Sequence, residues 1–358
     1  MKIFVTFLLV SALLLSLTSC VPHAKEEPSG ETVTAVESSD NPERYSGWVP
    51  YWDYTDSLLE IPMYGDSLTD VIAFAVIFRG EDNALLFLDA MTETVTRLRS
   101  AYSDKKTIYL SVTNDVQFED GTILQKDTDV LRRIFATDKT MDAHIDELLS
   151  AVENYGTDGL EIDYEAIRKD RELWSLFVTF IERLYARTQH AGLPLRVAIG
   201  SSDVHYAEFP TGPEYVVMCY NLFGMHSKAG PKADALFLRK TFADNRSLPG
   251  KVSMAFANGG FDWGSDGKCT SVTQEKALAL MNLHSVDQGQ LRRDSTSRSL
   301  TFSYNTDGVA HEVWFADQET LTYWISLARE SGYDSFAIWR FGGNVDSEIQ
   351  QIIQNPSY

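Results

Sequence analysis

Short apolar runs alternate with longer amphipathic stretches along most of the chain. The short runs are rich in β-branched and aromatic residues, which favours strands, whereas the longer stretches repeat their apolar positions at helical spacing. Eight short runs predict strands, at 47–52, 71–78, 107–113, 159–165, 195–200, 215–221, 251–257 and 335–341. Alternating strands and helices are typical of a parallel sheet, and eight strands close a (β/α)8 TIM barrel. A doubly wound open sheet would show the same alternation, so the count favours the barrel without excluding that alternative.

The alternation is interrupted from about 261 to 317. This segment contains a glycine-rich stretch read as a loop, a helix near 273–283, and two alternating runs at 299–304 and 309–315. The four residues between these runs end in Asp307-Gly308, which is a hairpin turn signal. We therefore predict a small α+β insertion before the last barrel strand, where it could wall a groove at the barrel mouth.

The first residues have the pattern of an export signal. Met1-Lys2 precedes an apolar run to about Leu17, and Leu17-Thr18-Ser19-Cys20 resembles a bacterial lipoprotein signal. That resemblance implies a signal peptide at 1–19, lipidation of Cys20, and anchoring to the outer face of the cell membrane or in the envelope. An ordinary cleaved signal or an uncleaved anchor are the alternatives. Residues 20–45 lack apolar periodicity and predict a flexible tether, which leaves 46–358 for the folded domain.

Composition excludes some functions. The chain is 44% hydrophobic, so it can bury a large core, and its formal net charge of -20 would repel nucleic acid. Besides Cys20, only Cys219 and Cys269 remain. They leave one bridge conceivable but form no CxxC pattern, and no HExxH motif occurs. We expect no metal and no cofactor.

Three acidic residues stand out in the run 159–165. Because side chains alternate along a strand, Glu161, Asp163 and Glu165 face one way while the apolar residues between them face the other. Like charges packed in a barrel lumen raise each other's proton affinity, so at least one carboxylate should be protonated near neutrality, as a general acid must be. Glu165 ends its strand, where active sites of such barrels lie. A solvated acidic strand or a cation site would show the same row.

The same segment carries a family resemblance. Asp158-Gly159-Leu160-Glu161-Ile162-Asp163-Tyr164-Glu165 resembles the DGxDxDxE signature of glycoside hydrolase family 18, the chitinase-like hydrolases. The remaining strands support it, with Gly47-Trp48-Val49-Pro50-Tyr51-Trp52, Ala73-Phe74-Ala75, Met218-Cys219-Tyr220-Asn221 and Ala337-Ile338-Trp339. His311-Glu312-Val313-Trp314-Phe315 and Trp339-Arg340-Phe341-Gly342 are similar to the spore-cortex peptidoglycan N-acetylglucosaminidase branch.

The resemblance implies substrate-assisted retaining hydrolysis of glycans that contain N-acetylglucosamine. Glu165 would be the proton donor, Asp163 would orient the acetamido group, and Tyr220 would hydrogen-bond it. Trp339 would form the floor beneath the sugar. The substrate-binding set would further include Glu161, Asn221, Met218, Phe74, Tyr51 and Trp52.

Two positions depart from the family pattern. Glu161 stands where the family has an aspartate, which puts its proton sharing with Asp163 in doubt, and Asn221 replaces the usual aspartate of MxYD. A catalytically inactive, chitinase-like carbohydrate-binding lipoprotein is therefore the main alternative, and a two-lobed solute-binding lipoprotein is a second. Peptidoglycan is favoured over chitin or an N-glycan, cleavage inside or at the end of the glycan stays open, and we expect a monomer.

Overall fold

The computed structural model of the 358-residue chain describes residues 43–344. The predicted signal peptide, Cys20 and all but the end of the predicted tether lie outside the described residues, as do 345–358. The first strand begins at Arg44, so the last two residues assigned to the tether belong to the folded domain instead.

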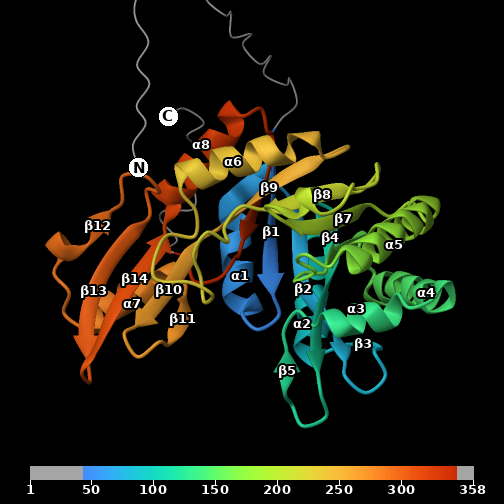
Figure 1. The fold of residues 1–358 in the computed structure, drawn as a ribbon, viewed down its shortest axis with the longest axis horizontal. Helices are drawn as coiled ribbons and strands as arrows, with labels where there is room; N and C mark the ends of the chain where they lie inside the picture. The colour runs from blue at the N-terminus through green and yellow to red at the C-terminus, as the bar shows by residue number, and fades with distance from the viewer. Residues whose placement is uncertain (1–42, 345–358) are drawn as a thin grey trace, which may run out of the picture. The chain divides into compact units, whose positions relative to one another are not determined.

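Eight parallel strands form a closed barrel, which confirms the predicted architecture (Figure 1). Each strand pairs with two neighbours, and the pairing of β2 with β4 completes the ring and rules out an open sheet. In order around the ring the strands are β1 (Arg44–Pro50), β2 (Leu68–Arg79), β4 (Thr107–Gln117), β6 (Gly159–Asp163), β7 (Leu195–Gly200), β8 (Glu214–Met218), β9 (Val252–Ala257) and β15 (Ser335–Trp339). Short strands β3 (Leu85–Leu86) and β5 (Ile123–Leu124) extend β2 and β4 as hairpins.

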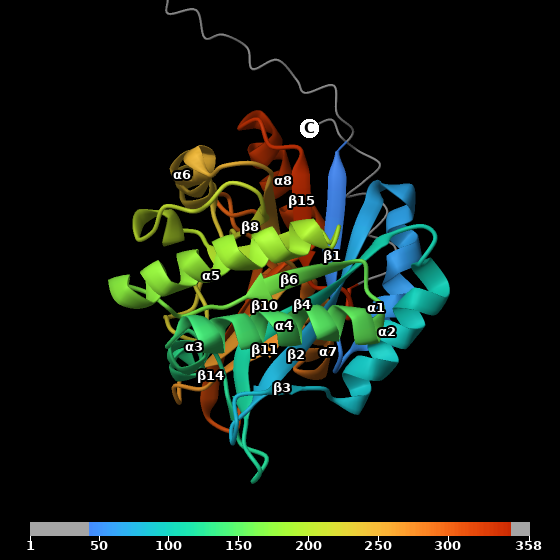
Figure 2. The ribbon, with the colours of Figure 1, turned by 90° about the vertical axis from the view of Figure 1, so that its right-hand side faces the viewer.

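Helices cover the outside of the barrel, and Figure 2 shows α4 and α5 lying across its strands. The α-helices of this layer are α1 (Tyr54–Glu60), α2 (Asp89–Tyr102), α3 (Thr128–Ile134), α4 (Asp138–Tyr155), α5 (Arg171–His190), α6 (Ala235–Asp244) and α8 (Gln318–Glu330). Short 3-10 helices occur at Ile61–Ser67, Asp203–His205, Asn245–Ser247 and Gln288–Gln290. The connection from β7 to β8 contains one of these turns in place of an α-helix. Within 43–344, no helix is both long and apolar enough to span a bilayer.

Local sequence signals explain where the helices next to β6 begin and end. The Thr137 side chain accepts a hydrogen bond from the Thr140 backbone N–H and starts α4. Gly156 ends that helix with φ of 64°, a left-handed conformation that glycine adopts without strain. Asp170 caps α5 by accepting from the Leu173 N–H at 3.0 Å. Both helices therefore have fixed starts. Strand β6 lies between them in the chain, after α4 and before α5.

The predicted insertion is a five-stranded antiparallel sheet with one helix, drawn in orange in Figure 1. Its elements are β10 (Gly259–Gly264), β11 (Cys269–Val272), α7 (Gln274–Leu283), β12 (Arg292–Arg293), β13 (Leu300–Thr306) and β14 (Val309–Ala316). The predicted helix and hairpin are present, but the glycine-rich stretch is strand β10 and not a loop. Its glycines permit close approach, because a Cβ on Gly260 would lie 1.7 Å from the Trp314 carbonyl oxygen of β14.

The barrel separates two apolar regions. The larger core lies between the strands and the helices. It includes Leu160 and Ile162 of β6 and Tyr164, which directly follows that strand. A smaller cluster fills the lumen, with Trp48, Ile72, Tyr109, Val216, Ala255 and Ala337. The alternation predicted for β6 is therefore confirmed, since its apolar side chains face the helices and its acidic ones face the lumen.

Candidate active site

Glu161 lies at the lower end of the acidic row and is fully buried in the lumen. The Trp48 indole Nε1 donates to its Oε1 at 2.6 Å, and the Arg196 Nε donates to its Oε2 at 3.0 Å. Within 43–344 no hydrogen bond joins Glu161 to Asp163. Both oxygens of Glu161 are therefore occupied by other donors, which fixes its carboxylate in one orientation.

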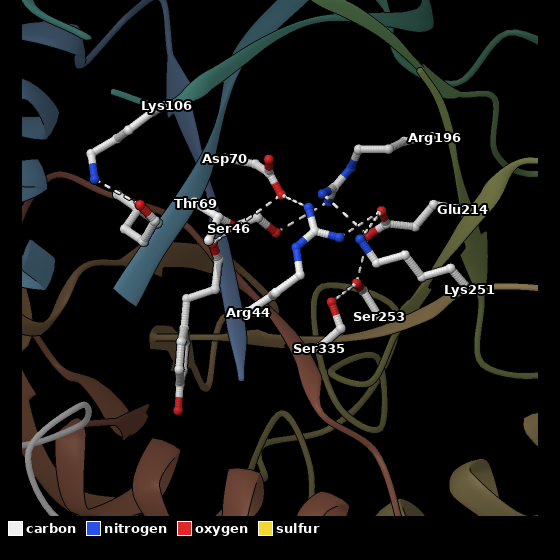
Figure 3. Close-up of polar contacts among 12 residues, drawn as sticks. Arg44, Ser46, Thr69, Asp70, Lys106, Arg196, Glu214, Lys251, Ser253 and Ser335 are labelled. Carbon is white, nitrogen blue, oxygen red and sulfur yellow. Dashed lines mark hydrogen bonds and ion pairs between the residues drawn. The ribbon is translucent and has the colours of Figure 1, made fainter. Parts of the chain in front are cut away.

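Besides Glu161, Arg196 also contacts a polar network at the base of the barrel, which Figure 3 shows. Its Nη1 lies 3.4 Å from Glu214 Oε1, and its Nη2 donates to the Ser46 hydroxyl at 3.2 Å. Glu214 also forms an ion pair with Lys251 at 2.9 Å, and Arg44 forms one with Asp70 at 2.6 Å. The cations and carboxylates alternate in this network, so the buried charges compensate one another.

Asp163, by contrast, forms no ion pair in the described part of the chain. It is 8% exposed, and its Oδ1 atom is buried without a hydrogen-bond partner. Thr113 lies opposite it on β4, and the Thr113 hydroxyl is likewise buried and unpartnered. Burial, followed by the charge of Glu165, raises the pKa of Asp163 well above its usual range. The predicted rise is therefore present, but burial contributes more to it than the repulsion between carboxylates does.

Glu165 follows β6 at the carboxyl end of the barrel. Its backbone N–H donates to Asn114 Oδ1 at 2.9 Å, and its carbonyl accepts from Asn114 Nδ2 at 3.1 Å. Its side chain is 18% exposed and forms an ion pair with Lys126 from the β4–β5 hairpin side. Burial lowers the pKa of Lys126, but Glu165 and Asp163 raise it more, so the net shift is upward and the ammonium stays charged. The predicted proton donor thus lies at the mouth and not in bulk water.

Tyr220 follows β8 and packs against the lumen cluster, as predicted from the alternation of its strand. Met218 is buried on the same strand, while Cys219 faces the outer core. Burial, followed by the charges of Glu165 and Asp163, raises the pKa of Tyr220 well above its usual range. The phenol therefore stays protonated and can donate a hydrogen bond. Asn221 is exposed beyond it.

The aromatic residues predicted for the site form a connected series. Trp339, at the end of β15, packs edge-on against Trp48 and Phe74, with ring centroids 5.8 Å and 4.7 Å apart. Phe74 contacts Trp52 at 6.0 Å, and Trp52 contacts Tyr51 at 5.0 Å. Trp52 is 54% exposed, so the series runs from the lumen out to solvent. Such a surface suits the apolar face of a sugar.

The described residues contain no group of three or more His, Cys, Asp or Glu side chains arranged to hold a metal ion. Cys219 and Cys269 are both free, so the conceivable bridge between them is not formed.

Sequence reasoning missed three residues near the acidic row. Arg196 could have been found, because it is the one charged residue in an apolar strand and its alternation points it into the lumen. Lys126 left no such signal, since it reaches Glu165 from a hairpin 39 residues earlier in the chain. Asp115, whose Oδ1 accepts from the Lys126 backbone N–H at 2.8 Å, was missed for the same reason.

The amino-acid sequence matches a known protein family. The model of the family described as "Glycosyl hydrolases family 18" matches residues 47–344. Cortical fragment-lytic enzymes of Bacillus anthracis and Bacillus cereus are each 24% identical to the chain, over 59% and 74% of it. The chain covers 52% and 63% of the length of these two relatives.

Solved structures show the same fold. A chitinase from Chromobacterium violaceum superposes with a TM-score of 0.71 at 18% identity, covering 87% of this chain and 98% of that one. At this identity the likeness concerns the fold alone. It agrees with the eight-stranded barrel.

Proposed function

The chain belongs to glycosyl hydrolase family 18, and from that premise we propose that it hydrolyses glycans containing N-acetylglucosamine by substrate-assisted retaining catalysis. Glu165 is the proton donor, Asp163 and Tyr220 hold the acetamido group, and Trp339 supports the sugar ring. The observation that carries the proposal is the buried Asp163 carboxyl, whose Oδ1 has no protein partner although it lies beside Glu165 and Tyr220.

In the first step, Glu165 gives its proton to the glycosidic oxygen while the bond from that oxygen to the anomeric carbon breaks. The acetamido carbonyl oxygen of the same sugar attacks the anomeric carbon, and an oxazolinium ion forms. The leaving sugar departs as an alcohol. In the second step, the Glu165 carboxylate takes a proton from water, the water oxygen bonds to the anomeric carbon, and the oxazolinium reopens. No carboxylate nucleophile is needed.

The raised pKa of Asp163 suits this reaction. Burial makes the charged form of Asp163 costly, so its carboxylate gains most when a positive charge develops next to it. The oxazolinium supplies that charge only as the reaction proceeds. Asp163 therefore stabilises the transition state more than the bound substrate, which is the condition for accelerating the chemical step.

Peptidoglycan is the substrate that we propose, with Cys20 lipidated and the enzyme held at the outer face of the cell membrane. The cortical fragment-lytic relatives support this choice, and the chitinase with the same fold makes chitin the comparison substrate. Mass spectrometry of products from purified peptidoglycan and chitin would identify the substrate and distinguish internal from terminal cleavage. Mass spectrometry of the mature N-terminus would test lipidation of Cys20, because an unmodified Cys20 would remove the anchor from the proposal.

The Glu165→Gln variant tests the proposed donor. It keeps the size of the side chain but cannot donate the proton, so release of reducing ends from chitooligosaccharides and peptidoglycan should fall by at least about a hundredfold. Binding of the same glycans should persist. Near-normal turnover would remove Glu165 from the mechanism, and indifference of the wild-type enzyme to a thiazoline mimic of the cyclised sugar would exclude substrate assistance.

A carbohydrate-binding protein without turnover is the competing function. It predicts that the wild-type chain binds these glycans and releases no reducing ends from any of them. Retention of both Glu165 and Asp163 on the lumen side of β6 favours the hydrolase, because binding alone does not require a buried carboxyl beside a proton donor.

A further inference from the structure

A cavity opens beside Glu165, next to the proposed acetamido site. Its volume is about 440 Å3. It is lined by Glu165 together with Tyr164, Ala166, Ile167, Arg168, Lys169, Trp174, Ala198, Ile199, Gly200, Ser202, Asp203 and Tyr206. Neither Asp163, Tyr220 nor Trp339 lines it. A proton donor stands between the reacting sugar and the sugar that leaves, so a cavity that shares Glu165 but none of the proposed acetamido-binding residues can receive part of the leaving sugar.

Two cations lie on the cavity wall. Arg168 and Lys169 are exposed, and within 43–344 neither side chain forms an ion pair or a hydrogen bond. Most other arginines of this acidic chain have a carboxylate partner, as Arg183 has in Asp138 and Asp142 at 2.7 Å and 2.6 Å. The two unpaired cations are therefore available to an anion that enters the cavity.

The carboxyls that line the same cavity do not satisfy these cations. Glu165 is paired with Lys126 on its other side. Asp203 accepts a hydrogen bond from the Gly200 N–H at 2.6 Å, and burial raises its pKa, which weakens it as a competing anion. Besides the two cations, the remaining titratable groups on the wall are the phenols of Tyr164 and Tyr206, and burial raises the pKa of Tyr164 well above its usual range.

The loop that carries the cations is fixed. Ala166 and Arg168 have φ of 63° and 55°, left-handed values that persist in non-glycine residues only where the surroundings impose them. The Arg168 carbonyl accepts from the Trp174 indole at 2.7 Å, and the Ile167 carbonyl accepts from the Asp170 N–H at 3.2 Å. The backbone that carries the two cations is thus held beside the proton donor before any ligand arrives.

We propose that this cavity is a subsite for a carboxylate-bearing substituent on the sugar that leaves, such as the lactyl carboxylate of a muramic acid unit. Arg168 and Lys169 bind the carboxylate, and the Trp174 and Tyr206 side of the cavity receives its apolar part. The inference rests on the proposed function, and it adds the reason why an anionic glycan would be preferred over neutral chitin by a chain whose net charge is -20.

The test compares two glycans that differ only in the substituent. One is a neutral chitooligosaccharide, and the other alternates N-acetylglucosamine with muramic acid that carries a free lactyl carboxylate. The double variant Arg168→Gln/Lys169→Gln should lower kcat/KM for the anionic glycan by about tenfold, the size expected from losing charge-assisted hydrogen bonds, and for the neutral glycan by less than about twofold. Converting the carboxylate to its methyl ester should abolish the difference between wild type and variant.

Arg171→Gln is the matched control, since Arg171 is an exposed arginine at the start of α5 that does not line the cavity. Equal losses on both glycans, or the same loss from Arg171→Gln, would overturn the subsite. Equilibrium binding of the anionic glycan, measured with all variants in a Glu165→Gln background, separates this inference from the proposed catalysis. Weaker binding in the double variant supports the subsite even if turnover is absent, and unchanged binding rejects it.

Discussion

The two carboxyls of β6, Glu161 and Asp163, have different surroundings in the lumen. Glu161 is held by an indole and a guanidinium, whereas Asp163 has a buried oxygen without a partner. The sequence predicted both side chains in the lumen from alternation alone. It could not predict their separate roles, because these depend on Arg196 and Trp48, which other strands bring to the same point.

Asp163→Asn should lower activity and raise stability at neutral pH. Because the folded-state pKa of Asp163 is raised above its unfolded value, its contribution to stability is full below the unfolded pKa and is lost as pH rises through the folded pKa. An amide carries no such loss, so the stability advantage of the variant should grow from acid to neutral pH. Urea unfolding at both pH values measures this, with the exposed Asp104→Asn as control. If the difference in unfolding free energy between variant and wild type did not change with pH, the pKa of Asp163 would not be raised in the folded state.

Arg196→Met should be severely destabilising. It would leave Glu161 buried without its cation, whereas Glu214 keeps Lys251, and breaking a buried pair in this way typically costs about 3–5 kcal/mol. The loss would appear as a lower free energy of unfolding in urea. The double variant Arg196→Met/Glu161→Gln should recover part of it, because the carboxylate left without a cation is removed. If the free energy of unfolding of the single variant were within about 1 kcal/mol of the wild-type value, the buried network would not stabilise the barrel.

At the scale of elements, patterning predicted the barrel well and the connections poorly. All eight strands were predicted because each is a short run rich in β-branched or aromatic residues between longer stretches of helical period. Strand β10 was missed because glycines hide its alternation, and they are present for the close approach to β14. The missing helix between β7 and β8 and the contact of Lys126 with Glu165 depend on loop conformation, which leaves little trace in hydrophobic periodicity.

Asp170→Ala should lower stability by about 1 kcal/mol, because it removes the acceptor that caps α5. Asp170→Asn keeps an acceptor but loses the ion pair with Arg132, so it should cost less. Thermal or urea unfolding of the two variants separates the cap from the charge. Equal losses in both would show that the ion pair, and not the cap, stabilises this end of the helix.

At the scale of the whole molecule, the insertion and the barrel meet near the mouth. Lys232, on the segment between β8 and α6, donates to the Asn258 carbonyl at 2.7 Å, and its ammonium lies 5.4 Å from the centre of the Phe261 ring on β10. Burial, followed by the charge of Arg340, lowers the pKa of Lys232 to about 7. Lys232 therefore links β10, at the start of the insertion, to Asn258 at the end of β9. Asn258 in turn donates a hydrogen bond to the carbonyl of Arg340, which follows β15.

Gly260→Ala should loosen the insertion while leaving the barrel folded. The new methyl group would meet the Trp314 backbone at 1.7 Å, so β10 and β14 would have to separate. We expect new protease cleavage within 259–316 and weaker glycan binding. In Gly264→Ala the nearest atom is the Asp266 side chain, which can move, so this variant is the control. Cleavage throughout the barrel would contradict a local effect.

The aromatic series from Trp48 through Trp339 and Phe74 to Trp52 has a practical consequence. Three of the chain's seven tryptophans lie in it, spanning the floor of the proposed site and its exposed edge. A glycan resting on these indoles would alter their emission spectrum. Occupancy could then be followed by intrinsic fluorescence in a protein that is not turning over.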